Sequence, residues 1–217
     1  MAVTAIRRPN ELEPPQVLAP ERYDPRREVP VQAGVVTVRL GDLVQCVRET
    51  ISPGDNKYDN CFVLDTSHAA EGFVHLPSET KCSASIGSSK KVARAGDVIV
   101  SRLRPYLRQV AWIDDALANA DAVLCSTEFF VLRSSDEHSI SFLAPVLLTR
   151  TVHSVLIAAQ EGGHHPRFNE ATLLALRVPQ SVLSEREKIS RLVAESVADF
   201  RRANSKFSMA ISASTGR

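Results

Sequence analysis

Short apolar segments bounded by polar and turn residues recur through the first half of the chain. Val36 and Val38 alternate with polar residues, which is the two-residue period of a strand, whereas 98–100 is a continuous apolar run of the kind that a buried strand has. These segments predict five strand regions, which are 36–38, 60–66, 98–100, 107–113 and 121–134, the last with room for two strands. Two other segments differ: Leu40, Leu43, Val44 and Val47 recur at helical spacing, and the serine-rich stretch 84–91 predicts a polar loop.

The second half of the chain changes to the period of a helix. Residues 139–160 are apolar and helical in pattern, with Pro145 as an interruption near their start. A glycine-containing loop follows at 161–169, and then a short helix at 169–176 that Asn169 caps. The expected fold is therefore mixed α/β (α+β), with a mostly β first half, helices in the second half and a long C-terminal helix.

The clearest helical pattern begins at Ser184, which forms a capping-box pattern with Glu187. At about 1.5 Å per residue this helix would be about 37 Å long. Such a helix packs on its own domain or forms a coiled coil with a partner. We assign 183–208 to a spacer or dimerisation helix and 209–217 to a flexible tail. The apolar seam of the helix consists of Ile189, Leu192, Val193, Val197, Phe200 and Phe207.

Residues 1–33 contain half of the chain's twelve prolines, interleaved with charged residues. Proline fixes φ and removes a backbone donor, so this composition argues against a helix and against a central strand. We expect an extended, proline-rich arm that either lies on another surface or is disordered. The globular domain then spans residues 34–182.

Composition indicates in which cellular compartment the protein is expected and whether it binds nucleic acid by charge alone. The formal net charge is +1, whereas a free-standing domain that binds nucleic acid by charge alone is strongly basic. The longest apolar run, 140–148, is about half of a membrane span, and the N-terminus lacks the apolar core of a signal peptide. The four cysteines are spaced neither as CxxC pairs nor as zinc ligands. We expect a cytoplasmic protein with reduced thiols and no membrane association.

Motifs for catalysis and cofactor binding are not evident in the sequence. It contains no nucleophile elbow, no Walker loop and no dinucleotide-binding glycine motif. His164 and His165 are adjacent in a glycine-rich loop, but they have no evident carboxylate partner in the sequence. We expect no catalytic residue, no metal and no cofactor; a small hydrolase or nuclease that uses these two histidines is the enzymatic alternative.

Basic residues gather in two segments, 90–108 and 164–169. In the first, six cations accompany a single acid, Asp97, and Arg102 and Arg104 have the strand parity that points both to one face. Arginine forks match phosphates and the guanine edge, and asparagine can read adenine. The candidate DNA-binding residues are Lys90, Lys91, Arg94, Arg102, Arg104, Arg108, His164, His165, Arg167 and Asn169, and the loop-shaping residues are Gly96, Pro105, Gly162 and Gly163.

Two interpretations of these basic residues make different predictions. In the first, both segments form one DNA-facing surface, on which Arg104 or Arg167 reads a base while Lys90 and Lys91 bind phosphates. In the second, Arg102 and Arg104 form ion pairs with carboxylates such as Asp97 or Glu128, and they only stabilise the fold.

Four segments, taken in order, resemble a known family. They are "VRLGDLVQ" (38–45), "VARAGDVIVSRLRP" (92–105), "STEFFVLRS" (126–134) and "EGGHHPRFNEATLLALRVPQSVLSEREKI" (161–189). Over residues 36–205 the chain is similar to one target recognition domain of a type I restriction–modification specificity subunit. The resemblance implies a mixed α/β domain at 34–182 that reads a short DNA half-site, followed by a spacer helix.

The resemblance also implies partners and the absence of catalysis in the subunit itself. Such subunits carry two recognition domains, and this chain has room for one, which implies a half specificity subunit or a module of a related defence system. The family's usual glutamine before the spacer helix is replaced, with Arg186 near that place. The implied partners are double-stranded DNA, an adenine methyltransferase subunit, a restriction nuclease subunit, and a second copy or a similar subunit paired through the C-terminal helix. The alternative is a protein–protein adaptor of the same fold that does not read DNA.

Overall fold

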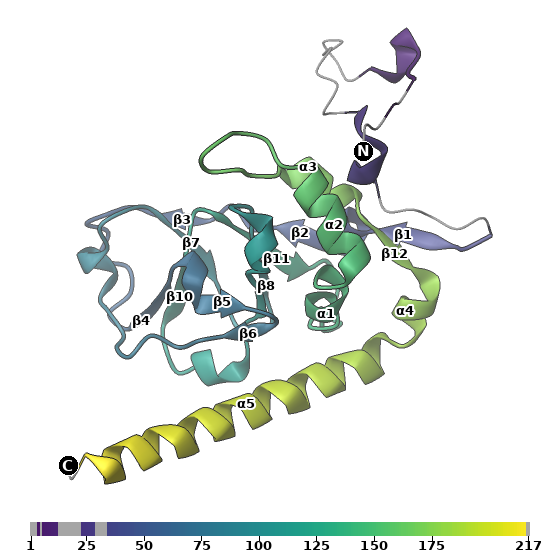
Figure 1. Cartoon of the computed structure of the whole chain (residues 1–217). Coiled ribbons are helices and arrows are strands. Elements are labelled where there is room, and N and C mark those ends of the chain that lie inside the picture. The colour runs from purple at the N-terminus through teal and green to yellow at the C-terminus, as the bar shows by residue number, and fades with distance from the viewer. Residues whose placement is uncertain (1–3, 5, 13–22, 29–33, 216–217) are drawn as a thin grey trace.

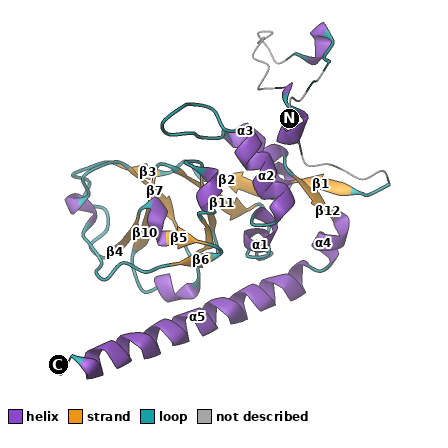
Figure 2. Cartoon of the chain, viewed as in Figure 1, coloured by secondary structure: helices purple, strands orange, loops and turns teal. Residues whose placement is uncertain are grey.

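The chain folds into short strands, short helices and one long C-terminal helix (Figures 1 and 2). The structure, a computed structural model, describes residues 4, 6–12, 23–28 and 34–215. Its strands are β1 (Thr37–Arg39), β2 (Val44–Cys46), β3 (Thr50–Ile51), β4 (Cys61–Leu64), β5 (Ala69–Ala70), β6 (Phe73–Val74), β7 (Lys90–Ala93), β8 (Val98–Ser101), β9 (Val110–Trp112), β10 (Ala122–Ser126), β11 (Phe129–Ser134) and β12 (Arg177–Pro179). Its α-helices are α1 (Leu143–Leu147), α2 (Arg150–Ala158), α3 (Glu170–Ala175), α4 (Gln180–Ser184) and α5 (Arg186–Ser214).

Two four-stranded sheets form most of the β part of the fold, and β1 with β12 and β5 with β6 form two small two-stranded sheets. One of the larger sheets has the strand order β3-β7-β10-β4, and the other has the order β2-β11-β8-β9. The pairings within them are antiparallel except for that of β10 with β4, which is parallel. β10 and β11 follow each other in the chain but belong to different sheets, so the turn between them joins the two sheets.

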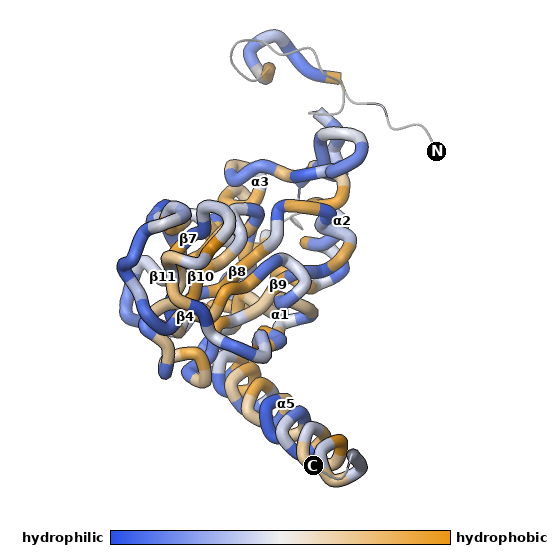
Figure 3. The backbone as a smooth tube through the Cα atoms, turned by 90° about the vertical axis from the view of Figure 1, so that its left-hand side faces the viewer, coloured by the Kyte–Doolittle hydropathy of each residue, from blue (hydrophilic) through white to orange (hydrophobic). Residues whose placement is uncertain are grey.

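The strands β8 and β11 lie at the centre of the fold because both of their faces are buried. Val98 and Val100 of β8 belong to the same buried cluster as the apolar side chains of α1, α2 and α3, whereas Ile99 belongs to a second cluster with residues of the other sheet. The side chains of β11 divide between the same two clusters. A strand buried on both faces needs a continuous apolar run, and the sequence of β8 supplies one. Figure 3 shows the same pattern, with hydrophobic colours along β8 and hydrophilic colours on the surrounding loops.

The helix α5 packs on its own domain over part of its length. Val197 is buried, and the ring of Phe200 stacks on that of Phe73 at 4.6 Å between centroids. The guanidinium of Arg201 donates to the buried carboxylate of Asp114 at 3.0 and 3.2 Å and to the carbonyl of Val74 at 2.6 Å. Further along, the side chains of α5 are exposed, so the helix continues past the edge of the domain (Figure 1).

Part of the proline-rich arm docks beside α2. Pro25–Arg27 forms a short 3-10 helix, and Arg27 donates to the carbonyl of Ala159 at 3.1 Å and to the carboxylate of Glu161 at 3.0 Å. A second 3-10 helix spans Pro9–Glu11. Both begin with proline, which the first helical turn tolerates because the N–H there has no partner in any case. Most of the remaining arm lies outside the described residues.

Most of the expected elements are confirmed, including the mixed α+β class. The segments 60–66, 98–100, 107–113 and 121–134 contain β4, β8, β9 and the pair β10 and β11. The helical interpretation of residues 40–47 is wrong, because a 3-10 turn leads there into β2, which pairs with β11. Hydrogen bonding to a distant strand thus overrides the local spacing.

Three further boundaries differ from the expectation. Lys90 and Lys91 belong to β7 rather than to a loop, because they pair with Ser126 and Cys125 of β10. The capping box is wrong, since Ser184 ends α4 and its hydroxyl donates to the carbonyl of Ser181 at 2.9 Å. The helix α5 begins at Arg186 and continues to Ser214, into the segment assigned to a tail. No helix among the described residues is long and apolar enough to cross a membrane.

Replacing Arg201 with alanine tests how α5 is attached. We expect Arg201→Ala to lower the free energy of unfolding by roughly 3 kcal/mol, because it leaves the buried carboxylate of Asp114 without its partner. Arg202→Ala is the matched control, since within the described ranges this neighbouring arginine makes only an exposed ion pair with Asp199. Urea titrations followed by circular dichroism measure both, and equal losses for the two variants would contradict this account.

Candidate nucleic-acid interface

Two loops that are distant in the sequence are joined by backbone hydrogen bonds. The amide of Arg104 donates to the carbonyl of Pro166 at 2.8 Å, and the amide of Phe168 donates to the carbonyl of Arg102 at 3.2 Å. Leu103 and Arg167 form an isolated antiparallel bridge between these contacts. We call residues 102–108 and 161–168 the paired loops. In Figure 1 the loop between α2 and α3 lies on the side of the domain opposite to α5.

The first of the paired loops turns sharply as soon as β8 ends. Arg104 and Arg108 have left-handed backbone conformations with φ of 47° and 55°, and the 3-10 helix Pro105–Leu107 lies between them. The carbonyl oxygen of Pro105 accepts a hydrogen bond from Nε2 of His153 on α2, at a distance of 3.0 Å. β8 ends at Ser101. Pro105 alone would allow the strand to continue through Arg104, so the strand ends three residues before the proline makes it necessary. The strand parity that related Arg102 to Arg104 therefore does not apply.

Glu128 lies where the two basic segments meet. The pairing of Phe129 with Ser101 continues by one residue, and the amide of Arg102 donates to the carbonyl of Glu128 at 2.9 Å. The carboxylate of Glu128 accepts from Nε of Arg102 at 3.1 Å and from Nε and Nη2 of Arg167 at 2.9 and 2.7 Å. The hydrogen bonds from Arg167 have the largest effect on the pKa of Glu128, and with the one from Arg102 they hold it below its usual value. Partial burial of the carboxylate opposes this shift.

His164 and His165 are exposed on the paired loops, and Arg104 beside them is half-exposed. The guanidinium of Arg104 lies 3.3 Å from Nδ1 of His165. Both histidines are exposed, and His164 forms no hydrogen bond within the described part of the chain. Gly162 is left-handed at φ of 90°, which an L side chain rarely adopts. The loop that presents the two histidines therefore depends on this glycine.

The two lysines of β7 do not share a face. As neighbours on a strand they point to opposite sides of the sheet. Lys91 donates to the carbonyl of Phe129 at 2.7 Å, and its pKa is lowered, mainly because burial removes water from the ammonium group. The side chain of Lys90 is only 11% exposed and lies 3.5 Å from the carboxylate of Asp65. Lys91 therefore lies beside Phe129, which follows Glu128 directly, and Lys90 lies on the other face.

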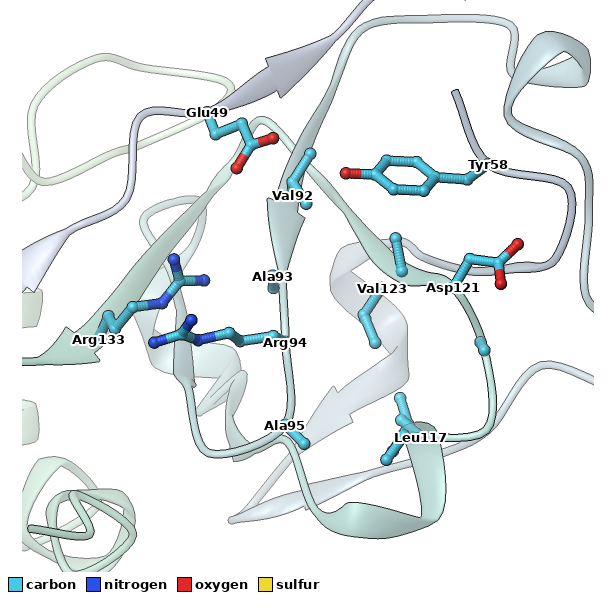
Figure 4. Close-up of a pocket in the computed structure, with 13 residues that line it drawn as sticks. Glu49, Tyr58, Val92, Ala93, Arg94, Ala95, Leu117, Asp121, Val123 and Arg133 are labelled. Atoms are coloured by element: carbon cyan, nitrogen blue, oxygen red, sulfur yellow. The ribbon is translucent and has the colours of Figure 1, made fainter. Parts of the chain in front are cut away.

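Arg94 and Arg108 lie away from Glu128. Arg94 follows the far end of β7, where it lines a pocket of about 470 Å³. Figure 4 shows the guanidinium groups of Arg94 and Arg133 on one side of this hollow and Asp121 on the other. Arg133 is bound by the buried carboxylate of Asp97 at 2.7 and 2.9 Å. Arg108 forms an ion pair at 3.1 Å with the exposed Glu71.

Of four other expected site residues, three have local structural roles. Oδ1 of Asn169 accepts from the amide of Thr172 at 2.8 Å, so Asn169 caps α3 as expected and this oxygen is already occupied. Gly96 is left-handed and shapes the turn between β7 and β8, not the paired loops. Pro105 is buried at the start of its 3-10 helix, and Gly163 has no positive φ.

Some residues at this surface were missed by the sequence analysis. Tyr106 and Leu107 are exposed at the tip of the first loop although both are large and apolar, at 49% and 47%. The ion pair of Arg27 with Glu161 attaches the arm to the base of the second loop. No periodicity connects positions more than a hundred residues apart, so this contact has no sequence signal. Glu128 was named only as one possible carboxylate for Arg102, and the structure selects it over Asp97.

The four cysteines are free thiols, and Cys61 and Cys125 are buried in the core. Burial raises the pKa of Cys46 and of Cys61 to about 11. In the part of the chain that the structure describes, no three His, Cys, Asp or Glu side chains form a group that could hold a metal ion.

Two solved structures share the architecture of this chain. One is a chain from a study of complex assembly and conformational transition of the type I restriction–modification system, with a TM-score of 0.60 and 25% identity. The other is the HsdS subunit from Thermoanaerobacter tengcongensis, with a TM-score of 0.56 and 23% identity. This chain shares their fold. The match covers 86% and 82% of this chain and 47% of each of the solved chains, so it spans about half of their length.

The sequence comparisons add no further assignment. No protein-family model matches the sequence. No curated protein matches it either. The resemblance expected from the four sequence segments is thus confirmed through the structure.

Asn169 provides a test of whether a predicted DNA contact is in fact a helix cap. We expect Asn169→Ala to lower the free energy of unfolding by about 1 kcal/mol, because the amide of Thr172 loses its acceptor. Asn169→Asp keeps the accepting oxygen and should retain stability, although it removes the amide donors that adenine reading requires. Thermal melts and DNA titrations of both variants decide the role. A stable Asn169→Asp protein that lost preference for an adenine would contradict the capping role.

Proposed function

We propose that the chain is a DNA-recognition subunit of a type I-like restriction–modification system or of a related defence system. The observation that carries this proposal is the pair of hydrogen-bonded loops, which present Arg104, His164 and His165 to solvent beside the anchored Arg102. The fold shared with the HsdS subunit supports the same conclusion. One recognition domain followed by a long helix corresponds to half of such a subunit.

In the proposed function the chain reads DNA and a partner performs the chemistry. The exposed cations of the paired loops contact phosphates and base edges, which position the protein and specify the sequence respectively. An adenine methyltransferase subunit supplies methyl transfer, and a restriction nuclease subunit supplies cleavage. The near-neutral net charge fits this division, because phosphate attraction can be shared with those subunits.

A second candidate function is a protein–protein adaptor of the same fold. The pairing of Arg102 and Arg167 with Glu128 favours it, because ion pairs within the protein reduce the charge available to DNA. The exposed Phe207, Met209 and Ile211 near the end of α5 also favour it, because they offer apolar area to a protein partner.

The salt dependence of DNA binding separates the two candidates. We expect log K for a DNA duplex to fall linearly with log salt, by about 0.9 per phosphate contact. Arg104→Ala should weaken binding and lower this slope without lowering the melting temperature, because Arg104 makes its side-chain contact only with the exposed His165 among the described residues. Arg94→Ala is the control, since Arg94 lies at the far end of β7. A DNA affinity that Arg104→Ala leaves unchanged would favour the adaptor. The absence of DNA binding even at low salt would favour it as well.

The free end of α5 is the proposed site of pairing with a second copy or with a similar subunit. Part of the expected seam is covered by the chain's own domain, because Ile189 and Val197 pack there and Phe200 stacks on Phe73. Phe207 and Ile211 continue the same helical face and are 70% and 50% exposed. The covered residues Ile189, Val197 and Phe200 are therefore not available to a partner. Phe207, Ile211 and Leu192, which is 51% exposed, are available.

Phe207→Asp tests pairing without disturbing the fold. We expect the unmodified chain to associate at tens of micromolar and the variant to be monomeric with an unchanged melting temperature. Met209→Asp is a matched control, because Met209 is also exposed but lies about 200° around the helix from Phe207. Sedimentation velocity measures all three proteins. A monomeric unmodified chain, or equal effects of the two variants, would contradict pairing through this face.

A further inference from the structure

Arg102 is fixed both through its backbone and through its side chain. Its amide donates to Glu128 at 2.9 Å and its carbonyl accepts from Phe168 at 3.2 Å, so both of its backbone groups are fixed. Its Nε donates to the carboxylate of Glu128 at 3.1 Å. Neither Nη1 nor Nη2 forms a hydrogen bond with the described residues, and the side chain is 41% exposed. The open end of the guanidinium therefore faces outward from a fixed base.

The neighbouring arginines differ from Arg102 either in the anchoring of the side chain or in the number of guanidinium nitrogens that remain unbonded. Arg167 donates through Nε and Nη2 to Glu128 and through Nη1 to the carbonyl of His165, so each of its nitrogens already has a partner. Nη2 of Arg104 lies 3.3 Å from Nδ1 of the exposed His165, and this is the one side-chain contact of Arg104 among the described residues, so its Nε is not anchored.

Arg108 also has an anchored Nε and no partner for its Nη groups among the described residues, but the carboxylate that holds it, Glu71, is 69% exposed. Glu128 is only 21% exposed and is itself held by Arg167, so Arg102 has the firmer anchor.

We propose that Arg102 reads a guanine in the target DNA through Nη1 and Nη2, and that Glu128 is the positioning residue that holds it. This inference rests on the proposed function and names the residue that carries part of the specificity. It differs from the sequence-based expectation, which assigned base reading to Arg104 or Arg167. The reading geometry is end-on, with two parallel N–H groups directed at O6 and N7 of one guanine.

Fixed geometry favours a base edge over a phosphate as the ligand of Arg102. A phosphate accepts hydrogen bonds from many directions, so a flexible cation binds it well. A guanine edge presents two acceptors in one plane, and an arginine that is already oriented loses less side-chain entropy on binding it. The carboxylate of Glu128 also offsets part of the positive charge, which reduces attraction to DNA of any sequence.

Selection from a randomised duplex library tests the proposal on the full chain. The unmodified protein should enrich a motif that contains a guanine. Arg102→Lys keeps the charge but loses the fork, so it should lose the preference at that one position by about 5- to 150-fold, the equivalent of roughly 1–3 kcal/mol, and retain the rest of the motif. Glu128→Gln should relax the same position to a smaller extent. Thermal melts establish that each variant is folded.

The outcomes separate the inference from the function on which it rests. An unmodified chain that enriches no motif overturns the proposed function itself. A motif that is kept by Arg102→Lys, whether with unchanged affinity or with equal weakening for all sequences, overturns base reading by Arg102 alone. A Glu128→Gln variant that changes a different position overturns the positioning role. Arg94→Lys is the control for the chemical change, and it should leave both motif and affinity unchanged because Arg94 lies away from the paired loops.

Discussion

The register between β8 and β11 is the constraint on which the candidate interface depends. Ser101 pairs with Phe129, so the next residues along, Arg102 and Glu128, meet directly where the strands leave the core. A slip of one residue in this pairing would turn each side chain to the opposite face of the sheet. Ile99 would then point into the cluster that now holds Val98 and Val100, and those two valines would point into the cluster of Ile99. Burial on both faces thus fixes the register, and the register fixes which carboxylate meets which arginine. The geometry of the surface is in this way determined by the core beneath it.

Charge at this surface is balanced rather than simply positive. Glu128 lies with Arg102 and Arg167, Glu170 with Arg48, and Glu161 with Arg27. Each pair limits non-specific attraction to a polyanion, because the counterions released on binding scale with the number of phosphates neutralised. Specificity then has to come from the orientation of a few donors. A chain with a net charge of +1 is suited to that division, provided that other subunits contribute to affinity.

Local patterns predicted the parts of the structure that local forces decide. The apolar run of β8 and the cap at Asn169 each depend on a few neighbouring residues, and both are confirmed. The bridge between Leu103 and Arg167 joins positions 64 residues apart, and the left-handed conformation of Arg104 is enforced by the loops around it. Neither has a local signature, because non-glycine residues adopt positive φ only under tertiary constraint. The sequence therefore identified the basic segments without showing which arginine was free.

The attachment of α5 extends the same reasoning to assembly. The Arg201–Asp114 ion pair and the stacking of Phe200 on Phe73 fix the direction in which the helix leaves the domain. The loop between α2 and α3, which is the second of the paired loops, lies on the opposite side of that domain (Figure 1). A partner bound at Phe207 would therefore stand at a set distance and angle from the reading surface, with no flexible linker between them. In the proposed pairing, the separation of two DNA half-sites would follow from helix length and docking, and would not depend on the residues that read the bases.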